Sequence, residues 1–352
     1  MKDKNISPER IARKKRLILL SMLFILIACV LFSFSLGRYP VPIKELLGIL
    51  WHKAAGVFGI ETEQFWQDQM MTAVWNIRLP RVLLSVLVGA SLAAAGAAYQ
   101  GVFQNPMASP DILGASAGAG FGAALGILLG FSNFTITLFA FGMSLASVAL
   151  VFTVSRHAKG DRVLGLVLAG IMISSLFQAG TSFIKLVADP NNKLPQITYW
   201  LMGSLSGAQW KNVRLAIFPI FLGLLPLLLL RWRINVLTMG DDEALAMGVD
   251  AGKIRLAVII SSTLVTAGAV SVSGMIGWVG LVIPHMMRRL VGSDYRYLMP
   301  ASVLGGGIFL MIVDNISRNA FSSGIPIGIL TAFVGAPFFL WLICGKGKNN
   351  GN

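Results

Sequence analysis

The residue types that most often carry out chemistry are few in this sequence and lie far apart. The three histidines, His52, His157 and His285, fall in separate segments without the spacing of metal ligands. The nearest approach to a phosphate-binding loop is GVDAGKI at 248–254. It has three residues between its glycines where a P-loop has four, and Ile follows the Lys where Ser or Thr should bind magnesium. We therefore expect no catalytic set, no metal site and no ATP hydrolysis in this chain.

Binding chemistry is more evident in the segment 76–106, NIRLPRVLLSVLVGASLAAAGAAYQGVFQNP. Arg78 and Arg81 stand at the start of an apolar run that is rich in Gly, Ala and Ser, and a Gln-Asn-Pro turn ends it. In lipid, small residues allow helix backbones to approach closely. We expect this run to form a close-packed, pore-forming helix. The turn is a candidate pore constriction, because non-helical backbone at membrane depth must be buried or line a wet cavity, and a plain turn is the alternative.

Composition indicates which elements must carry these residues. The 352 residues are 55% hydrophobic and only 12% charged, against about 25% charged in an average soluble protein. A helix needs roughly 20 apolar residues to cross a bilayer, and we count ten such stretches. They lie at about 17–36, 82–103, 112–130, 134–155, 163–187, 213–230, 256–273, 276–290, 298–316 and 325–344. We predict an all-α polytopic membrane protein, with a membrane domain at 17–345 between short tails, 1–16 and 346–352.

The distribution of charge predicts an orientation. The formal net charge of +14 would suggest nucleic acid in a soluble protein, but the positive-inside rule explains it without that partner. With the N-terminus in the cytoplasm, nineteen of the 29 Lys and Arg fall in cytoplasmic segments. A long outer segment at 37–81 holds five of the other ten. We expect both termini to be cytoplasmic.

One apolar stretch, 256–287, is too long for a single span and tests this count. Its 32 residues contain no Asp, Glu, Lys or Arg, and basic residues flank it on both sides. That flanking favours an even number of crossings. We predict a hairpin of two short helices that turns near Ser273 and Gly274, with the second helix interrupted by Gly280 and Pro284. One long tilted helix is the alternative.

The segment 231–255, RWRINVLTMGDDEALAMGVDAGKIR, is too long for a tight turn. Its DDEALAMG part predicts a short helix that Asp241 or Asp242 caps and Gly248 ends. A short helix with apolar residues at the membrane face is typical of a partner-binding surface. A helix resting on lipid headgroups is the alternative, and the acidic cluster argues against it on an anionic leaflet.

The predicted spans lack the buried ionisable residues that mark proton or sodium coupling. Asp314 and Arg318 lie four residues apart, so we expect an ion pair within one helix. A secondary transporter, which needs ion sites near the bilayer midplane, is therefore the weaker alternative. A carrier of this composition would draw its energy from another subunit.

Several landmarks in a fixed order match a known family over nearly the whole chain. They are NIRLPR (76–81), GAAYQGVFQNPMASPDILGASAGAG (96–120), WLMGSL (200–205), MGDDEALAMGVD (239–250), GMIGWVGLVIPHMMRRLVGSDYR (274–296) and IPIGILTAFVGAPFFLWL (325–342). The chain resembles the FecCD family, the membrane-spanning permease subunits of ABC importers for iron-siderophores, haem and vitamin B12.

The resemblance implies a set of partners. It implies a ten-span subunit that forms a homodimer, or pairs with a related permease, in a bacterial or archaeal cytoplasmic (inner) membrane. Two ABC ATPase subunits, which bind ATP and magnesium, dock on the cytoplasmic loop at about 236–250, and an extracytoplasmic substrate-binding protein docks outside. The subunit itself is implied to be a transport protein without a cofactor.

The resemblance also implies roles for residues near the two membrane surfaces. Arg78, Arg81 and Arg318 match arginines that meet acidic residues of the binding protein, and we expect Arg78 and Arg81 to be exposed at the outer entrance. Asn105, Pro106 and Met107 match a cytoplasmic gate. A second gate falls near Val163 and Leu164.

The coupling loop resembles the Glu-Ala-Ala motif of importer permeases, although Leu245 stands where the motif has its second Ala. The residues expected to contact the ATPase are Gly240, Asp241, Glu243, Ala244, Ala246 and Gly248. Our expectation for the cargo is a metal chelate, an iron(III)-siderophore first, with vitamin B12, haem or molybdate as alternatives.

Overall fold

The computed structural model describes residues 8–345, apart from 38, 61, 158–161 and 321–323. The described part of the chain is helical and contains no strand. The all-α prediction is therefore confirmed for these residues. The predicted tail at 346–352 lies outside them, whereas the first helix already begins at Pro8, within the predicted N-terminal tail.

Ten helices coincide with the ten apolar stretches of the sequence, and shorter helices connect them. The ten are α1 (Pro8–Ser35), α4 (Leu79–Val102), α5 (Ala115–Leu128), α6 (Asn133–Ser155), α7 (Arg162–Val187), α9 (Trp210–Leu229), α12 (Ala251–Ser273), α13 (Val279–Val291), α14 (Tyr295–Ala320) and α15 (Ile327–Gly345). The connecting helices are α2 (Ile43–Val57), α3 (Asp68–Met71), the π-helical turn η1 (Thr72–Arg78), the 3₁₀ turn η2 (Pro110–Leu113), α8 (Lys193–Leu201), α10 (Arg231–Leu237) and α11 (Asp241–Ala246).

Among the described residues, seven helices are long and apolar enough to cross a membrane. They are α1, the continuous helix at 68–102 that contains α4, α6, α7, α9, α12 and α14. The helices α5 and α15 are apolar but shorter. The chain is thus a multi-pass membrane protein, while the count of ten spans stays a prediction.

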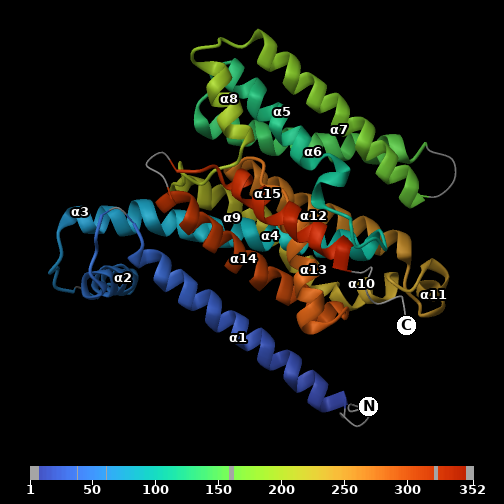
Figure 1. Cartoon of the computed structure of the whole chain (residues 1–352), viewed down its shortest axis with the longest axis horizontal. Helices are drawn as coiled ribbons and strands as arrows, with labels where there is room; N and C mark the ends of the chain where they lie inside the picture. The colour runs from blue at the N-terminus through green and yellow to red at the C-terminus, as the bar shows by residue number, and fades with distance from the viewer. Residues whose placement is uncertain (1–7, 38, 61, 158–161, 321–323, 346–352) are drawn as a thin grey trace.

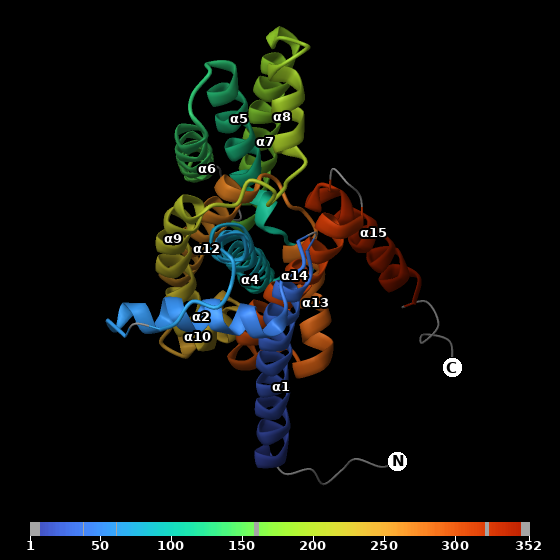
Figure 2. The ribbon, with the colours of Figure 1, turned by 90° about the vertical axis from the view of Figure 1, so that its left-hand side faces the viewer.

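Helix α4 lies at the middle of the molecule, and Figure 2 shows it nearly end-on, with α9, α12, α13 and α14 around it. On one side of this group, α5, α6, α7 and α8 pack together; on the other, α1 lies against α14. Figure 1 shows α2 and α3 at one end of the molecule and α11 at the opposite end. We refer to these as the α3 end and the α11 end.

The small residues of α4 serve close helix packing. A Cβ atom at Gly89 would lie 2.2 Å from the carbonyl oxygen of Gly306 in α14, and one at Gly96 would lie 1.7 Å from that of Gly280 in α13. Every residue from Val88 to Val102 is buried. The close-packing part of the prediction is therefore confirmed. The pore-forming part is wrong for the stretch 88–102, because neighbouring helices bury every residue of it within this subunit.

The long apolar stretch is divided as the flanking charges predict. Helix α12 ends at Ser273, Gly274 adopts a positive φ of 70°, and α13 begins at Val279. One long tilted helix is therefore excluded. The predicted interruption of the second helix is wrong, since α13 runs without a break through Gly280 and Pro284. Pro284 is the sixth residue of α13 and has no N–H to donate to the carbonyl oxygen of Gly280, so the helix continues with one backbone hydrogen bond missing.

Candidate functional site

An ion pair joins α4 and α14 at the α3 end. Nε of Arg81 lies 3.0 Å from each carboxylate oxygen of Asp314, and Nη2 lies 2.9 Å from Oδ1. The Asp314 side chain is 2% exposed and that of Arg81 is 16% exposed. The predicted pair between Asp314 and Arg318 is therefore wrong. Asp314 faces α4, the helix against which α14 packs most extensively, and the bidentate contact with Arg81 satisfies both of its oxygens.

The other two arginines hold the end of α1. Arg78 is buried and donates to the carbonyl oxygens of Phe34, at 2.5 Å, and Tyr39. Arg318 donates from Nη2 to the carbonyl oxygen of Ser33, at 2.5 Å, and to the Asn315 side chain. The last four carbonyl groups of a helix have no partner within it. Cations at a helix C-terminus also interact favourably with its dipole, so both arginines cap α1.

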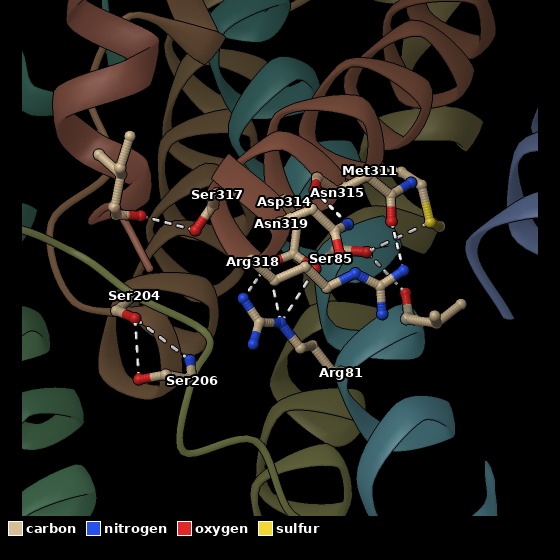
Figure 3. Close-up of polar contacts among 12 residues, drawn as sticks. Arg81, Ser85, Ser204, Ser206, Met311, Asp314, Asn315, Ser317, Arg318 and Asn319 are labelled. Atoms are coloured by element: carbon tan, nitrogen blue, oxygen red, sulfur yellow. Dashed lines mark hydrogen bonds and ion pairs between the residues drawn. The ribbon is translucent and has the colours of Figure 1, made fainter. Parts of the chain in front are cut away.

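The three arginines nevertheless line one pocket, which we call the arginine pocket, with a volume of about 350 Å³. Tyr199, Ser204 and Ser206 line it as well and hydrogen-bond to one another. Figure 3 shows the Arg81–Asp314 pair beside Arg318, with Ser204 and Ser206 on a neighbouring loop. The sequence correctly grouped the three arginines, but the expectation of exposed side chains is wrong for Arg78 and overstated for Arg81.

The Asn105–Met107 turn lies at the far end of α4, and its three residues are exposed. Oδ1 of Asn105 accepts a hydrogen bond of 2.8 Å from the backbone N–H of Met107. This side-chain contact is an Asx turn, which fixes the conformation of the backbone locally. The predicted gate residues therefore form an ordered turn near the α11 end.

The predicted coupling segment contains a short helix, α11, and its C-terminal end is as expected. Gly248 has a φ of 75°, the left-handed conformation that glycine accepts at the end of a helix. The predicted N-cap is wrong. Gly240 occupies that position and no side chain caps it, because the carboxylate of Asp241 pairs with Arg255 at 2.8 Å.

The coupling segment divides into buried and exposed faces. Leu237, Ala244 and Val249 are buried against the rest of the protein. Leu245 is 72% exposed, and Met239 and Met247 are also exposed. The described chain therefore presents an unpartnered apolar surface at the α11 end, flanked by the exposed acidic residues Asp242 and Glu243.

A polar junction, which the sequence did not reveal, fixes the segment to the helices. Nδ2 of Asn235 donates to Asp294 at 2.7 Å, and its Oδ1 accepts from the backbone N–H of Tyr295 at 2.7 Å. Burial raises the pKa of Asp294, but hydrogen bonds from Arg296 and Asn235 outweigh it and lower the pKa to about 2. The carboxylate is therefore ionised at neutral pH and joins α10 to the start of α14.

Candidate metal ligands do not gather in the described parts of the chain: no group of three or more His, Cys, Asp or Glu side chains is positioned to hold a metal ion. The polar chemistry of the molecule is instead concentrated at the α3 end, in the arginine pocket, and at the α11 end, in the turn and the coupling segment. This arrangement suits binding to partners at both ends more than catalysis between them.

Comparison with known proteins places these features in a family. Residues 25–345 match the FecCD transport family. The chain is 39% identical over 326 residues to the molybdate import system permease protein MolB of Haemophilus influenzae, covering 92% of this chain and 94% of that protein. It is 42% identical over 270 residues to an iron chelatin transport system permease protein of Helicobacter pylori, covering 77% of this chain and 82% of that protein.

A solved structure has the same fold. It is an inward-facing conformation of a metal-chelate type ABC transporter, with a TM-score of 0.82 and 35% identity, covering 94% of this chain and 99% of that one. These relatives are transport subunits and not enzymes. The described helices, the two polar ends and the matches over nearly the whole length lead to one assignment: this chain belongs to the FecCD transport family of ABC importer permeases.

Proposed function

We propose that this chain is the permease subunit of an ABC importer that moves a metal chelate, an iron(III)-siderophore in the first instance, across the cytoplasmic membrane. The observation that carries this proposal is the exposed apolar surface of α11 in a chain whose sequence has no phosphate-binding loop. Such a surface suits an ATPase subunit that supplies the energy from outside the chain. The iron chelatin relative supports the choice of cargo.

The α11 end is the proposed docking site of the ATPase. Leu245 and Met247 would enter a groove of the partner, while Asp242 and Glu243 set the register of the complex. Ala244 is fully buried and anchors the helix. Gly240 has a φ of 130°, a backbone conformation that glycine accepts and other residues rarely adopt.

The arginine pocket is the proposed docking site of the substrate-binding protein. Acidic residues of that protein would approach Arg81 and Arg318, and charge-assisted hydrogen bonds would set the register. The internal partners change how this can occur: a carboxylate from outside must compete with Asp314 for Arg81 and with Ser33 for Arg318. Docking and a rearrangement of this end are therefore coupled in the proposal.

A second copy of the chain, or a related permease, is proposed to complete the pathway. A concave surface at α15 is lined by apolar residues that include Met202, Met275, Trp278 and Phe333, and Phe333 is 75% exposed. An exposed apolar surface of this kind suits contact with a similar surface. The turn at Asn105–Met107 would then act as the gate of the shared pathway.

A second cargo class is supported by one specific comparison. The Haemophilus influenzae relative, which matches this chain over almost its full length, is a molybdate import system permease protein. An oxyanion is therefore the alternative cargo, while haem and vitamin B12 remain within the range of the family.

The experiment is reconstitution of the chain with its genomic-neighbour ATPase and binding protein in lipid vesicles. Uptake and ATP hydrolysis are measured with the binding protein loaded with a ferric siderophore, haem, cobalamin or molybdate. Stimulation by the ferric chelate supports the proposal, and stimulation by molybdate alone assigns the oxyanion. ATP-independent uptake driven by a proton or sodium gradient would contradict the importer assignment.

A further inference from the structure

The predicted gate and the predicted coupling segment are joined by one side chain. Nε2 of Gln104, the residue before the Asn105–Met107 turn, donates a hydrogen bond of 2.8 Å to the carbonyl oxygen of Leu237. Leu237 is the last residue of α10, and its carbonyl is one of those that a helix end leaves without an internal partner. The bond spans 133 positions of the sequence.

The backbone conformation at Gln104 is one that glycine adopts with less strain than glutamine. Its φ is 50°, in the left-handed region, and the N–H of Asn105 bonds back to the carbonyl of Gln100. This is a Schellman-type helix end, at which glycine is the preferred residue. Among the described residues, Gln104 is one of two non-glycine residues with a positive φ. The glutamine therefore supplies something that glycine could not, namely the amide that reaches Leu237.

A second contact holds the coupling segment from its other side. Arg255, in α12, binds the carboxylate of Asp241 through two nitrogen atoms at 2.8 and 3.3 Å. The Arg255 side chain is 8% exposed. The segment is thus joined to the end of α4 through Leu237 and to α12 through Asp241, four positions later in the sequence.

Both attachments line one cavity of about 500 Å³, together with Val163 from the start of α7. The cavity is open to the surface of the molecule. Helix α11 can therefore move into this space without displacing packed side chains. The cavity brings together Gln104, which precedes the turn, the second predicted gate region at Val163 and the coupling segment.

We propose that Gln104 is the positioning residue that transmits displacement of α10 and α11 to the Asn105–Met107 turn, with the Arg255–Asp241 pair as the fixed attachment. This inference rests on the proposed function, because it assumes that a partner moves the coupling segment. A push on α11 moves the Leu237 carbonyl, the hydrogen bond carries Gln104 with it, and the adjoining turn changes its exposure.

The test uses the reconstituted importer complex and the variant Gln104→Gly. Glycine accepts the left-handed backbone, so the protein is expected to fold and to hydrolyse ATP at a rate close to that of the parent. Transport per ATP hydrolysed is expected to fall about fivefold or more, the effect expected when one coupling contact is lost. A purely structural role for Gln104 predicts no loss, because glycine suits this backbone best.

A second variant isolates the hydrogen bond. Gln104→Glu keeps the shape of the side chain, but at neutral pH its carboxylate cannot donate to the Leu237 carbonyl. It should uncouple transport at least as strongly as Gln104→Gly. The control for an added carboxylate is Gln100→Glu, one turn earlier in α4. Its side-chain oxygen accepts from Arg288 at 3.0 Å, which a carboxylate can still do, and only the long 3.5 Å bond from Nε2 to the Leu281 carbonyl is lost.

The turn itself provides a readout besides transport. In a background with Cys29 and Cys344 replaced by serine, Met107→Cys reports exposure through its rate of maleimide labelling. The parent rate should change on addition of ATP and vanadate, and in Gln104→Gly that change should disappear. Parent-like coupling and labelling in either Gln104 variant would overturn the inference. A parent complex without ATP-dependent uptake would instead overturn the proposed function.

Discussion

Helix α4 begins and ends in opposite ways. At the α3 end, Arg81 makes three hydrogen-bond contacts to the carboxylate of Asp314, which is 2% exposed, and Arg78 is buried against α1. At the α11 end, the helix passes into an exposed turn that one side-chain hydrogen bond, from Gln104, joins to the coupling segment. Between them, glycines pack α4 tightly against α13 and α14.

The comparison shows that a charged residue in the sequence is not necessarily free to bind a partner protein. The arginines that the sequence marks for docking already have internal partners. In contrast, the apolar side chains of Leu245 in α11 and of the neighbouring Met239 and Met247 are exposed. The α3 end therefore resists change until a partner competes for its arginines. The α11 end is ready to bind, and the rigid middle of α4 can carry a displacement between the two.

The largest expected loss of stability comes from breaking the Arg81–Asp314 pair at the α3 end. Asp314→Ala leaves Arg81 as an uncompensated charge in a mostly buried position, which typically costs about 3–5 kcal/mol. We expect a lower thermal midpoint of the purified protein in detergent, measured by the loss of the monodisperse peak on heating. The same variant would leave the α11 end unchanged, so binding of the ATPase at low temperature should persist.

The double variant Arg81→Met/Asp314→Leu distinguishes a pair from two separate effects. Replacing both partners by apolar residues of similar size is often neutral or stabilising. We expect the double variant to be more stable than Asp314→Ala. A double variant that is less stable than either single one would show that the two side chains do not act as a pair.

The next-largest loss of stability is expected in the tightly packed middle of α4. Gly96→Ala forces a methyl group against the Gly280 carbonyl, and overpacking of this kind costs about 1–3 kcal/mol. The control is Gly142→Ala in α6, where an added Cβ meets no atom within 4 Å and alanine favours the helix by about 1 kcal/mol. The thermal midpoint should fall for the first variant and hold or rise for the second.

Hydropathy located the elements well because a membrane span is a local property of the sequence. The flanking basic residues predicted the break after Ser273, and the capping preference of glycine predicted the helix end at Gly248. Hydropathy missed α2 and α3, which occupy much of the segment at 37–81, because short amphipathic helices lack the length signal of a span. Partner choice was also hidden: Asp314 had Arg318 one turn away, yet tertiary packing brought Arg81 across from α4.

The same limit applies to the candidate site. The Gln104–Leu237 bond joins residues far apart in sequence, and the left-handed backbone at Gln104 has no sequence signature when the residue is not glycine. The family motifs grouped residues correctly by region, since the arginines do line one pocket. They did not indicate which side chains were already bound.

A smaller effect is expected at the polar junction of the α11 end. The pKa of Asp294 is lowered from 3.8 to about 2, so its contribution, at most about 2 kcal/mol, is present above pH 4 and lost as the pH falls toward 2. Asp294→Asn should therefore lower the thermal midpoint at pH 7. The difference from the parent should vanish near pH 2; a difference independent of pH would show that ionisation is not its source.

The smallest change in the stability of the isolated subunit is expected for Leu245→Ser. The same variant is the most direct test of partner binding at the α11 end. Leu245 is 72% exposed, and exposed substitutions away from packed features usually change stability by less than about 0.5 kcal/mol. The thermal midpoint of the isolated subunit should therefore stay the same. Co-purification of the ATPase should decrease, because the variant removes apolar area from the surface that we assign to the partner. Leu245→Met keeps that area and serves as the control. If Leu245→Ser retained the ATPase fully, the exposed face of α11 would contact lipid headgroups instead. The contrast between an α3 end with internal partners and an α11 end that binds another subunit would then no longer hold.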